Sequence, residues 1–140
     1  MFGKPMNSVN AYAQVGLDSD IRTADPHRLI VLLFEGAESG IIVAKKAIEN
    51  NDIAAKHKAI RQITDIIMNG LLGSLDMEKG GEIAQKLEAL YQYMATRLVH
   101  ANLKNSIPAL DEVDSLLKEI HGAWLEIDPK RQPQQAAAGL

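Results

Sequence analysis

The amino-acid sequence predicts an all-α protein, an antiparallel four-helix bundle with an N-terminal arm docking on the bundle. Three observations lead to this fold class. Apolar residues recur with helical spacing in four segments of about 20 to 25 residues. Short turns containing Gly, Pro, Asn or Asp separate these segments, and no segment shows the alternating pattern of a strand. Helices joined by short turns pack side by side in opposite directions, which gives an up-down-up-down bundle.

The chain divides into three parts. Residues 1–24 contain Gly, Pro and isolated apolar residues without a sustained helical period, so we expect a loosely ordered arm. Residues 25–128 hold the four helical segments, which are long enough together to form one domain with its own core. Residues 129–140 have no apolar period and are expected to form a disordered tail.

Capping residues set the expected helix boundaries. Asp25 and Pro26 predict a helix start, because the carboxylate accepts unpaired N–H groups and Pro at the first helical position has no N–H to leave unpaired. Asp52 is the N-cap candidate of the second helix, and Ser106 opens the fourth. The expected helices span residues 26 to about 50, 53 to about 75, 82 to about 105, and 107 to about 127.

The apolar arcs of the first two helices are wider than a bundle core needs. The fourth helix keeps its apolar residues within about 140°, but the arc of the first covers roughly 200° and that of the second half of the second about 240°. The third helix has a core-facing stripe through Leu90, and it adds Val99 and Leu103 on its otherwise polar side. The surplus apolar surface must be covered by the arm, by a second copy of the chain or by a partner.

Metal, haem and catalytic chemistry find little support in the residues. There is no Cys, and the four His lie on four different predicted helices without the Glu-x-x-His motif of di-metal bundles. We therefore expect no cofactor and no catalytic site. His57, on an apolar side, is the one His expected to be buried, and Trp124 is expected in the core. An enzyme with a metal or haem in the bundle, using Met68 or Met94 with His121, is the alternative in this class.

The charges and apolar runs exclude two kinds of partner. Fifteen Lys and Arg against eighteen Asp and Glu give a net charge of −3, and the basic residues are scattered, so nucleic acid is not expected. Residues 29–34 form the longest apolar run near the N-terminus, far short of the ~20 residues that span a bilayer. We expect no membrane insertion, and the absence of Cys suits a cytoplasmic protein.

Several segments, in order along the chain, resemble a known family. Residues 80–102 read GGEIAQKLEALYQYMATRLVHAN, residues 33–37 read LFEGA, and weaker likenesses follow Tyr12 and precede Trp124. The sequence of these segments resembles that of the flagellin-specific export chaperones, the FliS family, over residues 9–125. Phe34 stands where the family more often has Tyr, and Lys86 where it has Asn.

The resemblance implies a cytoplasmic export chaperone, not an enzyme. Such a protein binds the disordered C-terminal region of flagellin, prevents premature polymerisation and delivers flagellin to the flagellar export apparatus. The alternative is a homodimerising structural or adaptor bundle, including a dimer that shares helices. We expect the arm and the surplus apolar residues of the second and third helices to contact the partner, through Tyr12, Ile21, Ile66, Leu71, Leu72, Leu75, Tyr91, Val99 and Leu103.

Overall fold

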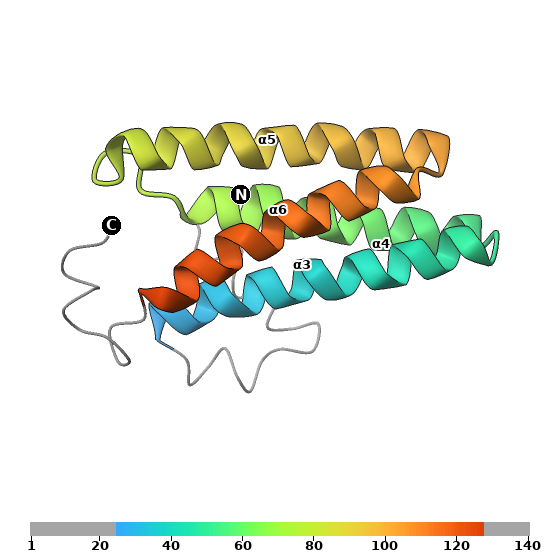
Figure 1. Cartoon of the computed structure of the whole chain (residues 1–140), viewed down its shortest axis with the longest axis horizontal. Coiled ribbons are helices and arrows are strands. Elements are labelled where there is room, and N and C mark those ends of the chain that lie inside the picture. Colours follow the sequence, from blue (N-terminus) through green and yellow to red (C-terminus); the bar gives the residue numbers. More distant parts are fainter. Residues whose placement is uncertain (1–24, 128–140) are drawn as a thin grey trace.

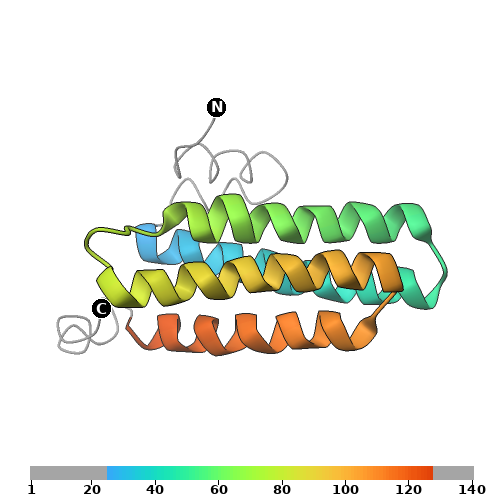
Figure 2. The same cartoon turned by 90° about the horizontal axis from the view of Figure 1, so that it is seen from above.

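The structure, a computed structural model, describes residues 25–127, and it confirms the all-α four-helix bundle. The expectations for the arm and for the tail lie outside the described residues. Successive helices run in opposite directions, as Figures 1 and 2 show from two sides. The described residues contain no strand. Their elements are α3 (Pro26–Glu49), α4 (Ile53–Asp65), the π-helix η2 (Ile66–Leu71), the 3-10 turn η3 (Leu72–Ser74), α5 (Gly81–Lys104) and α6 (Ile107–Glu126).

The predicted capping residues begin three of the four helices. The side chain of Asp25 accepts the N–H of Arg28 at 2.8 Å, and that of Asp52 accepts the N–H of Ala55 at 3.1 Å. Ser106 caps α6 in the same way. Each bond satisfies a donor that the first helical turn leaves unpaired. Asn105 ends α5 with φ 52°, in the left-handed conformation that Asn tolerates better than most residues.

The second predicted helix is not one continuous α-helix. It becomes a π-helix after Asp65, and the N–H of Leu72 donates to Ile67 O, five residues earlier. Within this region Ile67 and Leu71 are buried, whereas the other large apolar side chains are half-buried against the core. The wide predicted arc therefore wraps partly around the core, and no large apolar side chain between residues 66 and 75 is exposed.

One continuous core runs along the bundle axis. Gly40 allows α3 and α4 to approach closely, since a Cβ on Gly40 would lie 2.6 Å from Cγ1 of Ile63. The surplus predicted for the first helix is confirmed at its far end, where Ile42 and Val43 are 68% and 54% exposed. The largest fully buried side chains are those of Phe34, Leu33, Ile41, Ile63, Ile67, Met94, Leu98, Leu110, Leu117 and Val113.

Candidate partner-binding groove

The predicted partner-binding residues of α5 occupy two different environments. Tyr91 is buried in the core, and burial raises the pKa of its phenol well above the ordinary value. Val99 and Leu103, in contrast, are 58% and 75% exposed, as expected for side chains on the outer face of α5. A partner can reach Val99 and Leu103 without any change in the bundle, whereas Tyr91 supports the fold. Their roles in binding stay predictions.

The predicted residues of the second helix belong largely to the core. Leu71 is buried, and Ile66, Leu72 and Leu75 are half-buried and pack against the core. Their contact with a partner also stays a prediction. Tyr12 and Ile21 lie outside the described residues.

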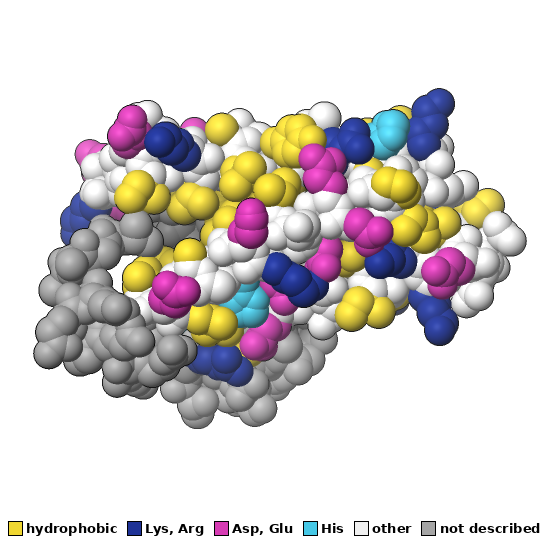
Figure 3. Space-filling model, viewed as in Figure 1, with side chains coloured by type: hydrophobic (Ala, Val, Ile, Leu, Met, Phe, Trp, Pro, Cys, Tyr) yellow, Lys and Arg dark blue, Asp and Glu magenta, His cyan; other side chains and the backbone are white. Residues whose placement is uncertain are grey.

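An apolar groove lies between the first half of α5 and the second half of α6, where the sequence indicated ordinary core. Figure 1 shows that α6 crosses at an angle, so that it lies near α5 at the α5–α6 turn and away from it at its own C-terminal end. The groove has a volume of about 310 Å³. Figure 3 shows hydrophobic side chains gathered on this face. The lining residues are Ile83, Leu87, Leu90, Leu116, Glu119, Ile120, Ala123 and Trp124.

The two halves of α5 are packed differently, and this difference forms the groove. In the second half, Met94 and Leu98 are fully buried. In the first half, Ile83 is 47% exposed, and Leu87 and Leu90 are half-buried at the edge of the core. Leu90 therefore packs against the core, as its place on the core-facing stripe predicted, but it is only half-buried because α6 has diverged from α5 at this level.

Trp124 closes the groove at the C-terminal end of α6. Its ring stacks on that of His27, with centroids 4.8 Å apart. The indole Nε1 donates to the backbone oxygen of His27 at 3.1 Å, and His27 Nε2 lies 2.7 Å from the backbone oxygen of Trp124. The expected core position of Trp124 is confirmed in part: the side chain packs against the core, is half-buried, and also lines the groove.

The histidines correct one prediction. His57 is exposed, because the inner position of the first turn of α4 is taken by Lys56, which is only 6% exposed. His121 is the histidine that packs inside: its ring stacks on Phe34, and Nδ1 lies 2.8 Å from Oε2 of Glu38 on α3. Lys56 could take the core position because its long methylene stem is apolar while its ammonium reaches polar atoms beyond.

The groove is suited to binding. It supplies aliphatic and aromatic surface, with the single carboxylate of Glu119 among its lining residues. Within residues 25–127 no group of three or more His, Asp or Glu side chains is placed to hold a metal ion. None of the helices in that range is both long and apolar enough to cross a membrane.

These features define an all-α four-helix bundle with a half-open apolar groove, and comparison with known proteins assigns the chain to a family. Residues 8–131 match the family described as flagellar protein FliS. The flagellar secretion chaperone FliS of Salmonella typhimurium is 45% identical over 130 residues, which cover 93% of this chain and 96% of that protein. The FliS chaperone of Escherichia coli is 40% identical over 116 residues, covering 83% and 85%. That of Bacillus subtilis is 30% identical over 135 residues, covering 96% of each. The chain belongs to the FliS family of flagellar secretion chaperones.

Proposed function

We propose that the chain is a cytoplasmic export chaperone that binds the disordered C-terminal region of flagellin and delivers it to the flagellar export apparatus. The observation that carries the proposal is the apolar groove between α5 and α6. A disordered segment that becomes helical on binding can lay its apolar face into such a groove. While it is held there, the same apolar face is not available for flagellin polymerisation.

The dimensions of the groove indicate what it can hold. Ile83, Leu87 and Leu90 follow one another over about 10 Å of helix axis. Two or three aliphatic side chains at helical spacing on a partner segment fit against them. Each would contribute roughly 1.5–3 kcal/mol on full burial, and ordering the segment costs about 2–5 kcal/mol. The groove alone therefore gives weak, reversible binding, and a tighter complex needs further contacts, for which exposed Val99 and Leu103 are available.

The proposal is tested with two matched variants on α5. Ile83→Asp places a charge inside the groove, and Val99→Asp places one on a similarly exposed β-branched residue outside it. Trp124 is the only Trp of the chain, so its fluorescence reports occupation of the groove by a Trp-free segment from the C-terminal region of flagellin. We expect a saturable change in emission, with affinity about tenfold or more weaker for Ile83→Asp, because the segment would bury that unpaired charge in the groove, and a smaller loss for Val99→Asp, whose contacts only add to those of the groove.

Other outcomes separate the alternatives. Normal binding by Ile83→Asp with weak binding by Val99→Asp would reject the groove and favour the predicted site around Val99 and Leu103. No binding by the wild-type chain would reject the flagellin assignment. Concentration-dependent light scattering that is lost in Ile83→Asp would instead favour a homodimer that fills the groove with a second copy. Circular dichroism melting curves confirm that both variants retain the helices.

A further inference from the structure

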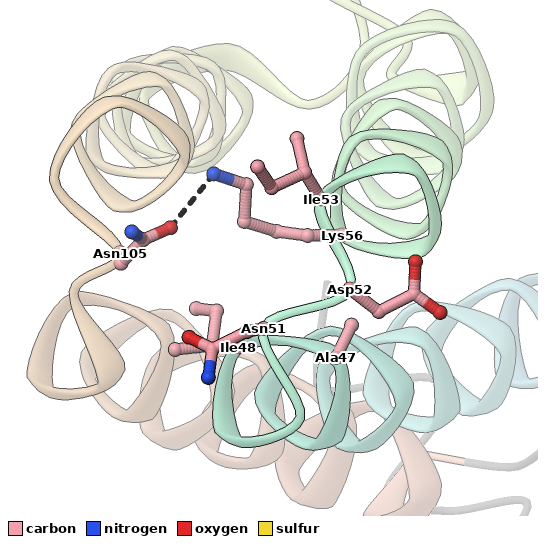
Figure 4. A pocket seen from close by; sticks show the side chains of 7 residues that line it. All are labelled: Ala47, Ile48, Asn51, Asp52, Ile53, Lys56 and Asn105. Atoms are coloured by element: carbon pink, nitrogen blue, oxygen red, sulfur yellow. Dashed lines mark hydrogen bonds between the residues drawn. The ribbon is translucent and has the colours of Figure 1, made fainter.

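A second candidate site lies at the opposite end of the bundle, where the α3–α4 turn meets the α5–α6 turn. Lys56 leaves the first turn of α4 and crosses toward the last turn of α5 (Figure 4). Its ammonium donates to the backbone oxygen of Asn102 at 2.9 Å and to Oδ1 of Asn105 at 2.7 Å. A lysine ammonium carries three N–H donors, so these two acceptors leave the third for another group.

The electrostatic environment of Lys56 favours an anion. The side chain is 6% exposed, and none of the ion pairs among the described residues includes it. The carbonyl end of α5 offsets part of the charge, because Asn102 O lies at the negative end of the helix dipole. Both acceptors are nevertheless neutral, whereas buried cations are usually paired with an opposite charge.

A cavity of suitable size borders Lys56. It has a volume of about 110 Å³, somewhat less than the ~150 Å³ of an engineered cavity that holds benzene. A carboxylate on one or two methylene groups fits in this space. Ala47, Ile48 and Ile53 are the apolar lining residues that can contact the methylene groups, and Lys56 and Asn105 are among the polar ones.

The surroundings point to a polypeptide, not to a free metabolite, as the source of the carboxylate. The cavity shares Ala47 and Asp52 with a shallower hollow of about 350 Å³ on the outside of the α3–α4 turn. Ile42 and Val43 line that hollow and are largely exposed, as is Ile53 beside the cavity. A small acid would leave this apolar surface uncovered, whereas the apolar neighbours of an acidic residue in a protein would cover it.

From these observations we infer that the cavity beside Lys56 binds a polypeptide carboxylate, either an acidic side chain or a chain terminus flanked by apolar residues. This site is separate from the α5–α6 groove and does not depend on the function proposed for it. Asp52 also lines the cavity, but its carboxylate caps α4 and points away from the ammonium (Figure 4). Asp52 therefore opposes the bound carboxylate only at longer range.

Chemical-shift titration of the full chain tests the inference with pairs of probes that differ in one charge. Acetyl-glutamate amide and acetyl-glutamine amide compare a side-chain carboxylate with its neutral isostere, and acetyl-leucine and acetyl-leucinamide do the same for a chain terminus. We expect the acids to shift the amide signals of Ile53, Lys56 and Asn105. The affinity obtained from these shifts should be at least tenfold higher for the acids than for the neutral probes. The acid that binds more tightly identifies the source as a side chain or a chain end.

Variants of the lysines and of Asp52 provide matched controls. Lys56→Gln retains hydrogen-bond donors without the charge and should lose about tenfold or more in affinity for the acids, whereas exposed Lys58→Gln should bind as the wild type does. Asp52→Asn keeps a good helix cap and should tighten binding severalfold.

Equal binding of acid and neutral probes, or unchanged binding by Lys56→Gln, would overturn the inference. Acetate binding as tightly as either acid would overturn the polypeptide assignment. If Lys56→Gln does not fold, the wild-type probe pairs still decide the question.

Discussion

The two ends of the bundle are held together by different kinds of contact. At the end that carries both tight turns, hydrogen bonds join the elements: Asp52 and Ser106 cap helices, and Lys56 joins α4 to the end of α5. At the other end the stacked and hydrogen-bonded pair of His27 and Trp124 links α3 to α6. Beside that pair the apolar groove opens, whereas at the first end α5 and α6 lie close together.

The comparison shows how one bundle can combine a closely packed end with an open apolar groove. Short loops and hydrogen bonds have directional requirements, so they fix α5 against α4 and α6 at the closed end. Where α5 and α6 diverge, their apolar side chains face each other across a space that neither helix fills, and no directional bond closes it. A partner can then enter without displacing the core residues that maintain the fold.

The largest effect is expected from truncating the same residue type in the two halves of α5. Leu98→Ala removes a fully buried side chain from the closed half and should lower the free energy of unfolding by about 2–5 kcal/mol. Leu87→Ala removes a half-buried side chain from the groove, where less burial is lost, and should cost about 1 kcal/mol. Urea denaturation followed by circular dichroism measures both. Equal losses would mean that the groove is closed in solution.

Most of the fold could be predicted from the sequence, because its determinants are local. Asp25, Asp52 and Ser106 marked the helix starts, and the apolar periods marked the faces that pack together. The π-helix could not be predicted in this way. A single wider turn shifts the apolar period only slightly, and such a shift cannot be detected when the apolar residues already cover a wide arc of the helix. The expected burial of His57 was wrong, and the inward position of Lys56 was not foreseen, since an apolar scale ignores the methylene stem of lysine.

The groove was missed for a physical reason. Leu87, Leu90, Leu116 and Ile120 have the spacing of core residues on their own helices, and periodicity carries no information about the angle between two helices. Exposed Val99 and Leu103 were visible because they break the polar pattern of their face. Apolar residues that interrupt a polar face can therefore be found from one sequence. A groove lined by residues with ordinary core spacing can be found only when the packing of the two helices is known.

The next largest loss of stability is expected from removing the ammonium of Lys56, which links α4 to the end of α5. Lys56→Met keeps a similar apolar stem but removes two hydrogen bonds from the ammonium to α5, so we expect a loss of about 1–3 kcal/mol in the free energy of unfolding. Lys58→Met, at an exposed position of α4, should change it by no more than about 0.5 kcal/mol. A stable Lys56→Met would show that α5 is held at this end by its apolar contacts alone.

A smaller loss of stability is expected from weakening the pair of Trp124 and His27 at the other end of the bundle. Trp124→Phe removes the indole N–H that donates to His27 O and should cost about 1 kcal/mol, with Leu125→Ala as a control at an exposed neighbouring position. Amide hydrogen exchange then tests whether the ends open independently. We expect faster exchange at the start of α3 and the end of α6, with unchanged protection in the first turns of α4. Uniformly faster exchange would mean that the bundle opens as one unit.

The smallest effect concerns an ion pair between α5 and α6 at the closed end. The Tyr93 hydroxyl donates to Glu112 at 2.5 Å and Arg97 Nε donates to it at 2.8 Å, and these bonds, that of Tyr93 first, lower the pKa of the Glu112 carboxyl from its ordinary value of 4.5. Because the pKa is lower in the folded protein than in the unfolded chain, the resulting stability is present above about pH 4.5 and is lost as the pH falls through the lowered value.

The urea midpoint of the wild type should therefore slightly exceed that of Glu112→Gln at neutral pH, and the difference should vanish in acid. Tyr93→Phe should reduce the pH dependence by removing the larger contribution. A difference between wild type and Glu112→Gln that is the same at neutral and acid pH would show that the carboxylate is not held by these bonds in solution.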